Sequence, residues 1–326
     1  MFSFVGSIAR PATRYTRCMH KQYVSRKSLG RIVLLAGFAL VLYGVVPQIG
    51  GLRESWRVVM HANIGLLLAA VGLLALTNVA AALIYQQLSL YRLQFLRTLT
   101  VEVACGLAGK LLPAGIGSLG LNAAYLRSNH HKLREALAVV AANNTLGFVA
   151  YLAVLAAAVV SLGTMWPSVH IARHTIFAAA IGLVLVALLI ATLVGKRAIH
   201  SLRMAIQGLR TYQRHPLRLV LALLCAATLP CLLTGVVYYA AQALGYHVSL
   251  SAAFAAFSAS QIVGSITPTP GGIVGAEAGL AGSLVAYGLN ADHAIIVALL
   301  YRLITYWLPM VPGGIALLWL RTRLAV

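Results

Sequence analysis

The chain has 326 residues, of which 61% are hydrophobic and only 9% are charged, and its mean hydropathy is +0.89. A soluble domain carries about 25% charged residues, so this chain has too few polar groups to cover a core with a hydrated surface. The excess of 25 Lys and Arg over five Asp and Glu would suggest nucleic acid in a soluble protein, but here the basic residues cluster between apolar runs, which is typical of cytoplasmic loops in a membrane protein.

The first 31 residues contain seven Lys and Arg and no acidic residue. This composition also fits an organellar transit peptide, but we favour a basic cytoplasmic tail on a membrane protein. The apolar run after Arg31 is long and is not followed by an Ala-x-Ala site, which argues against a cleavable secretory signal.

Six apolar runs after this tail approach or exceed the ~20 residues that a spanning helix needs. They lie at about 32–50, 60–84, 135–161, 175–195, 217–241 and 294–320. Two further apolar stretches, 99–121 and 251–289, are broken by proline and glycine. We therefore predict an all-α, polytopic membrane protein of six spanning helices and two broken hairpins, with up to eight crossings. The arms of the first hairpin are too short to cross, whereas the second could re-enter or form two full spans.

The distribution of basic residues predicts the topology. If each broken stretch enters and leaves on one side and the N-terminus is cytoplasmic, 20 Lys and Arg lie inside and three lie outside. The positive-inside rule strongly favours this arrangement over one in which the first broken stretch crosses once. We therefore expect a multi-pass protein of the cell (inner) membrane with both termini in the cytoplasm.

The two halves of the chain resemble each other. The sequence PAGI begins at Pro113 and PGGI at Pro270, 157 residues later, and the same offset places the second span on the fifth. It also places EALAVVA on DHAIIVA, whereas the first and fourth spans match less well. An odd number of crossings separates the halves, so 32–162 and 163–326 form an inverted-topology repeat after the tail 1–31.

Broken backbone inside a bilayer survives only against protein or a watery cavity, so we expect the two hairpins to enclose a site. Half-helix N-termini after each break would suit a phosphate or carboxylate. Glu277 and Arg302 lie in apolar segments and are predicted to pair, either to hold the second hairpin or to shape the site. The position of Lys110 near a hairpin tip favours snorkelling, and Asn143 with Asn144 suits hydrogen bonding between helices.

The stretch ITPTPGGIVGAEAGLAGSLVAYGL, followed by AIIVALLYRLITYWLPMVPGG, resembles the lysylphosphatidylglycerol synthase/flippase transmembrane-region family, especially its stand-alone bacterial members. LLPAGIGSLGLNAAYLR resembles the first conserved block of that family, and the resemblance covers about residues 32–320. It implies a lipid-flipping region, which in this family moves aminoacylated phospholipids, with relatives linked to hopanoid or polyprenyl-linked sugar metabolism. Many members have a charged residue where this chain has Asn143 and Asn144. Only six residues follow Leu320, so we expect no aminoacyl-transferase domain.

The resemblance nominates the residues of its two blocks as substrate-binding candidates, and three asparagines in the apolar segments are added to them. They are Pro113, Gly115, Gly117, Asn122, Arg127, Asn143, Asn144, Pro270, Gly271, Gly272, Glu277 and Arg302. We expect no catalytic residue, metal or cofactor, because the cysteines and histidines show no metal-ligand spacing and no catalytic motif is present.

The sequence therefore predicts translocation of a phospholipid or lipid-linked intermediate, with membrane lipids as partners, an anionic or lipid-linked substrate and no nucleic acid. Two alternatives stay open. The protein could be a non-transporting accessory subunit of a lipid- or glycolipid-modifying enzyme, or a membrane-embedded transferase. The scarcity of acidic residues argues against the transferase, since acid–base work on both substrates needs such groups.

The topology is testable at residues 200–215, which it places in a cytoplasmic loop. Single cysteines introduced there should not react with a membrane-impermeant maleimide added to intact cells, and should react after the membrane is opened. Cysteines at the predicted external position 173 serve as the positive control. Efficient labelling of 200–215 from outside would contradict both the topology and the inverted repeat.

Overall fold

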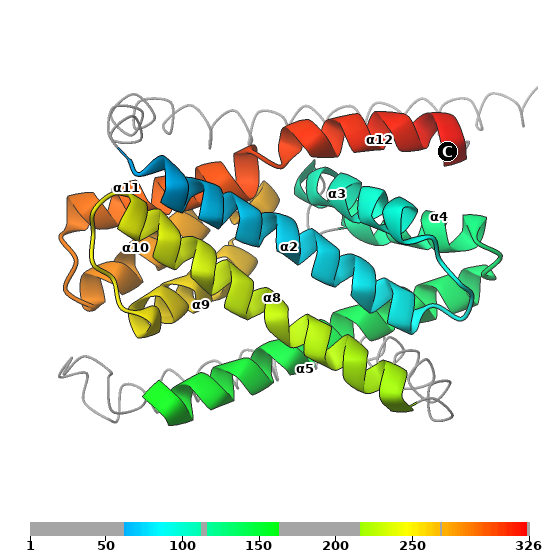
Figure 1. The fold of residues 1–326 in the computed structure, drawn as a ribbon, viewed down its shortest axis with the longest axis horizontal. Helices are drawn as coiled ribbons and strands as arrows, with labels where there is room; N and C mark the ends of the chain where they lie inside the picture. The colour runs from blue at the N-terminus through cyan, green and yellow to red at the C-terminus, as the bar shows by residue number, and fades with distance from the viewer. Residues whose placement is uncertain (1–61, 112–115, 163–215, 268, 325–326) are drawn as a thin grey trace, which may run out of the picture. The chain divides into compact units, whose positions relative to one another are not determined.

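The computed structural model describes residues 62–111, 116–162, 216–267 and 269–324, which belong to one compact unit within Gly51–Val326. Every regular element in these ranges is a helix (Figure 1). The predicted tail 1–31, the spans at 32–50 and 175–195, and the candidates Pro113 and Gly115 lie outside the described residues.

Four of the predicted spans are confirmed as long apolar helices. They are α2 (Ile64–Leu88), α5 (Leu133–Leu162), α8 (Pro216–Ala243) and a composite last helix. The last helix consists of α11 (Ala291–Arg302), a π-helical turn η4 (Leu303–Trp307) and α12 (Met310–Leu324). Each of the four is long and apolar enough to cross a bilayer, so the chain is a polytopic helical membrane protein.

The two broken stretches form helical hairpins. The first consists of α3 (Phe95–Leu111) and α4 (Ile116–Ser128), and the second of α9 (Leu250–Ile266), the short η3 (Pro270–Gly272) and α10 (Gly275–Ala286). The longest arm has 17 residues and is therefore about 26 Å long, less than the ~30 Å of a hydrocarbon core. The second hairpin, which the sequence left open, thus has arms that suit a re-entrant element rather than two spans.

The order long helix, two short helices, long helix occurs twice, as the predicted repeat requires. The long helices α2 and α8 lie side by side and run in opposite directions (Figure 1). The amide of Asn63, which caps the start of α2, donates to the carbonyl of Ala243 at the end of α8 over 2.9 Å. Opposite ends of the two equivalent helices therefore meet, which is the geometry of an inverted repeat.

The second hairpin is held together by small residues. A Cβ on Gly279 of α10 would lie 2.6 Å from the carbonyl oxygen of Ala259 in α9, and one on Gly264 would lie 3.0 Å from the Cβ of Ala276. Lipid tails are as apolar as the helices, so membrane helices associate through close packing of this kind rather than through hydrophobic burial. The Gly/Ala-rich sequence of this hairpin therefore specifies the tight contact between its arms.

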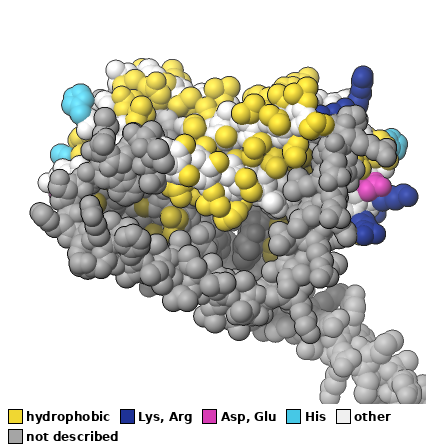
Figure 2. Space-filling model, turned by 90° about the horizontal axis from the view of Figure 1, so that it is seen from below, with side chains coloured by type: hydrophobic (Ala, Val, Ile, Leu, Met, Phe, Trp, Pro, Cys, Tyr) yellow, Lys and Arg dark blue, Asp and Glu magenta, His cyan; other side chains and the backbone are white. Residues whose placement is uncertain are grey.

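The surface follows the expected charge distribution. In the view of Figure 2, the described surface is broadly hydrophobic across its middle, and Lys and Arg side chains gather at one end. The exposed basic residues in the α2–α3 and α4–α5 connections, in the turns next to them and at the start of α8 are Arg92, Arg97, Arg127, Lys132, Arg134 and Arg218. A hydrophobic band that ends in a basic edge is what the predicted cytoplasmic face requires.

The glycine packing predicts a position-specific loss of stability. Gly279→Ala should lower the free energy of unfolding by about 1–3 kcal/mol, because its methyl group would overlap backbone in α9. Gly282→Ala in the same helix is the matched control, since a Cβ there meets nothing within 4 Å. Thermal unfolding of the purified protein in detergent measures both. Equal stability of the two variants would show that the arms do not pack as described.

Candidate functional site

The end of α3, the tip of the second hairpin and the break in the last helix lie together. Lys110 lies in the last turn of α3, Gly271 lies in η3, and Glu277 lies in the first turn of α10. Arg302 ends α11 and Tyr306 lies in the π-helical turn η4. We call these five residues the junction. It joins both broken elements to the break in the last helix.

Arg302 binds the tip of the second hairpin through two contacts. Its Nε donates to Glu277 Oε1 over 2.8 Å, and its Nη2 donates to the carbonyl oxygen of Gly271 over 2.9 Å. The two side chains are only 12% and 14% exposed. The predicted Glu277–Arg302 pair is therefore confirmed, and the guanidinium also binds the backbone of the break.

The two glycines of the break are required by its backbone. Gly271 and Gly272 have φ of 66° and 64°, which glycine adopts at no steric cost. A Cβ on Gly271 would overlap the Tyr306 ring, and one on Gly272 would lie 2.6 Å from the carbonyl oxygen of Gly264. Val274 also has a positive φ, of 74°, where a β-branched residue is rare. The tip of this hairpin is thus tightly packed at Gly271 and Gly272, and its backbone is strained at Val274.

Lys110 does not snorkel, in contrast to the sequence-based expectation. Its Nζ donates to the carbonyl oxygens of Thr305 and Tyr306, each over 2.9 Å. In an α-helix the carbonyl of Thr305 would accept from the amide four residues later, but that residue is Pro309, which has no N–H. The lysine therefore supplies the donor that the proline removes, and this holds the amine within the protein.

Two cations share one aromatic ring in the junction. The Nζ of Lys110 lies 4.9 Å from the centroid of the Tyr306 ring, and the Cζ of Arg302 lies 5.1 Å from it. Cation–π contacts offset part of the cost of placing charge at this depth. With one carboxylate, Glu277, against two cations, the junction carries a formal charge of +1. Such a site favours an anionic ligand.

The structure distributes the remaining candidates among three environments. Asn122 and Asn143 lie in a second polar cluster, where Asn122 hydrogen-bonds Glu102 and Asn143 donates to the Tyr85 hydroxyl over 3.3 Å. Gly117 packs against the Ala108 carbonyl within the first hairpin, and Pro270 begins η3. Arg127 and Asn144 are exposed and do not contribute to the junction.

Sequence reasoning did not assign Tyr306 and Glu102 to a site, and it assigned Lys110 the wrong position. Glu102 had a signal, because it is an acidic residue within an apolar stretch. No local sequence pattern could reveal the role of Lys110, since its partners lie 195 and 196 residues away.

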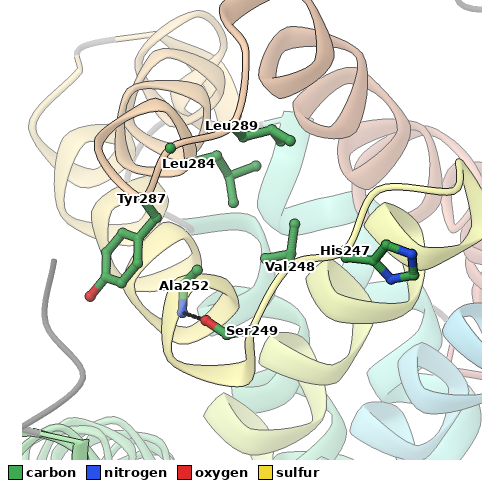
Figure 3. A pocket seen from close by; sticks show the side chains of 8 residues that line it. His247, Val248, Ser249, Ala252, Leu284, Tyr287 and Leu289 are labelled. Atoms are coloured by element: carbon green, nitrogen blue, oxygen red, sulfur yellow. Dashed lines mark hydrogen bonds between the residues drawn. The ribbon is translucent and has the colours of Figure 1, made fainter.

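Two pockets lie at the ends of the hairpins remote from the junction. One, of about 300 Å³, lies between the α8–α9 loop and the end of α10, where the side chains of Tyr287 and His247 point in opposite directions (Figure 3). The other, of about 320 Å³, lies at the α2–α3 loop with Arg92 and Arg218 in its lining. Because charges converge at the junction and not in the first pocket, we take the junction as the candidate functional site.

Among the described residues, no three His, Cys, Asp or Glu side chains come close enough together to hold a metal ion. The side-chain donors of the junction are a guanidinium and an ammonium group, which suit oxygen anions rather than metals.

Comparison with known proteins agrees with this arrangement. Residues 29–313 match the family described as the lysylphosphatidylglycerol synthase TM region. No curated protein matches the chain. The matched range contains both hairpins, the π-helical turn and all five junction residues. The chain therefore belongs to the lysylphosphatidylglycerol synthase TM-region family.

Proposed function

We propose that this protein translocates a phospholipid or lipid-linked intermediate with an anionic headgroup across the cell (inner) membrane, and that the junction binds the headgroup. The observation that carries the proposal is the surplus positive charge where the end of α3, the tip of the second hairpin and the last helix meet. Membership of a family concerned with lipid metabolism supports a lipid as the substrate.

The energetics of charge in a bilayer support an anionic headgroup. A charged side chain at the bilayer centre costs about 2.5–3.5 kcal/mol on insertion scales, so a surplus cation is retained where it binds something. Glu277 neutralises Arg302, whereas Lys110 contacts only carbonyl oxygens and the Tyr306 ring among the described residues. A phosphate diester carries the one negative charge that would balance the junction.

The geometry of Arg302 suggests how a headgroup enters. Its Nε and Nη2 bind one carboxylate oxygen and one carbonyl oxygen, an arrangement that two phosphate oxygens can reproduce. A phosphate that replaces these two ligands releases both Glu277 and Gly271 from the last helix. The second hairpin tip, with its positive-φ residues, then loses its anchor and can move.

The apolar surface beside the tip suits the rest of the lipid. Ile266 and Val274 flank the break and are 68% and 59% exposed. Acyl chains can stay against this surface and in the surrounding bilayer while only the headgroup crosses between the hairpins. The protein therefore needs a polar site of headgroup size rather than a tunnel for a whole lipid.

Reconstitution into vesicles tests this function with a fluorescent phosphatidylglycerol and a matched phosphatidylcholine. Quenching by an impermeant reductant reports translocation. The wild type should move the anionic lipid faster, Arg302→Leu should abolish movement, and Arg321→Met, which removes an exposed arginine outside the junction, should have no effect. The charge-swapped Glu277→Arg/Arg302→Glu double variant should recover part of the folding that each single change impairs by about 3–5 kcal/mol, because a carboxylate at position 302 restores the ion pair and cannot donate to the Gly271 carbonyl. It should not recover the transport.

The outcomes separate the alternatives. Absence of translocation in folded wild type would contradict the proposal and favour an accessory subunit. Chemical modification of the lipid without movement would favour a transferase. Full recovery of transport in the charge-swapped variant would show that the ion pair is purely structural.

The bond from Lys110 to the Thr305 carbonyl gives a second prediction. Lys110→Met should destabilise the protein by about 1–3 kcal/mol, because it leaves a partly buried carbonyl without a donor. Pro309→Ala in the same variant restores an amide for that carbonyl and should recover most of the stability measured by thermal unfolding. Transport should not recover, because the ammonium charge is still missing. Recovery of both would contradict a headgroup role for Lys110.

A further inference from the structure

A second polar cluster lies between the first hairpin and two long helices. It contains Tyr85 from α2, Glu102 from α3, Asn122 from α4 and Asn143 from α5. Tyr85 and Asn122 are 2% and 5% exposed. Helix α3 begins at Phe95, on the predicted cytoplasmic side. Glu102 is seven residues further on, so it lies about 10 Å along the helix from Phe95.

The carboxyl group of Glu102 is only half satisfied. It accepts a hydrogen bond from the Asn122 side chain, while Oε1 is buried and has no hydrogen-bond partner. None of the described Lys, Arg or His side chains forms an ion pair with it. A buried carboxylate without a cation is costly, and one proton on Oε1 removes that cost.

The groups around Glu102 do not provide a compensating charge. The Tyr85 hydroxyl and the Cys105 thiol are the titratable groups coupled to it electrostatically, and both are neutral when protonated. On α4, Tyr125 is hydrogen-bonded to Thr98, and η3 contains only Pro and Gly. On α12, Arg321 is exposed, and Lys110, two turns along α3, is bound to Thr305 and Tyr306.

We propose that Glu102 is a proton-binding site. It holds one proton on Oε1 while α2, α3, α4 and α5 pack as observed, and it releases that proton to water when the first hairpin opens. A conformational change of this hairpin would thereby be coupled to a proton gradient. The coupling rests on the proposed lipid translocation, whereas the binding of the proton does not.

The geometry favours a proton over a metal ion. A proton needs one oxygen atom, whereas an alkali cation needs several oxygen ligands around it, and Oε1 has no polar partner within hydrogen-bond distance. Comparison of the two hairpins shows that an ionisable residue at this place is specific to the first one. The equivalent arm of the second hairpin, α9, contains no ionisable residue, and its buried polar side chains are serines.

Infrared difference spectroscopy of the full chain in lipid nanodiscs tests proton binding without any transport assay. Raising the pH should remove a protonated-carboxyl band from the wild type, and Glu102→Gln should lack this band. Glu102→Asp should keep a band with a shifted midpoint. Glu135→Gln is the matched control, because Glu135 is partly exposed and binds the Lys132 amide at the start of α5, so the band should persist in it.

Transport in vesicles then tests the coupling. A pH gradient should accelerate lipid movement by the wild type, and Glu102→Gln should lose this acceleration while Glu135→Gln keeps it. Absence of the carboxyl band, its persistence in Glu102→Gln, or a response to sodium in place of pH would overturn the proposal. If the wild type moves no lipid, the proposed function fails, and the infrared titration still decides whether Glu102 binds a proton.

Discussion

Inside a bilayer, a backbone carbonyl that loses its N–H donor at a proline or at a break in a helix must find another donor, because no water is present to bind it. At two breaks among the described residues, side-chain cations supply such donors. Arg302 binds the carbonyl of Gly271 at the hairpin break, and Lys110 binds the carbonyls of Thr305 and Tyr306 at the break in the last helix. The cations therefore satisfy the carbonyls of the breaks, and the carbonyls in turn bind cations that would otherwise be costly inside the bilayer.

The use of cations as donors to these carbonyls has an electrostatic consequence. Neutral donors would satisfy the same carbonyls without charge, but here two cations are placed at one aromatic ring and one carboxylate balances them only in part. The stability of the folded protein and its affinity for an anion thus depend on the same side chains. Because Arg302 holds the hairpin tip through ligands that a phosphate can replace, the proposed headgroup binding would be linked to movement of the hairpin.

The two hairpins are similar in plan and different in chemistry. Both pack their arms closely through small residues, as at Gly117 and Gly279. The tip of the second hairpin contains the positive-φ glycines and binds Arg302. In the first hairpin, helix α3 contains Glu102, which has a buried oxygen without a hydrogen-bond partner. In our proposals, the two near-equivalent hairpins therefore have different roles, with the headgroup site at the second and the proton-binding site in the first.

The sequence by itself determined the class of protein, four long helices to within a few residues, both breaks and the pairing of Glu277 with Arg302. These features follow from local rules, since hydropathy, helix-breaking residues and the cost of charge in lipid act on short stretches of chain. Only the tertiary structure decided the role of Lys110, the Tyr306 ring between two cations, and the separation of Asn122 and Asn143 from the junction. Those depend on contacts between residues up to 196 positions apart, and no periodicity or composition encodes which distant carbonyl a lysine will reach.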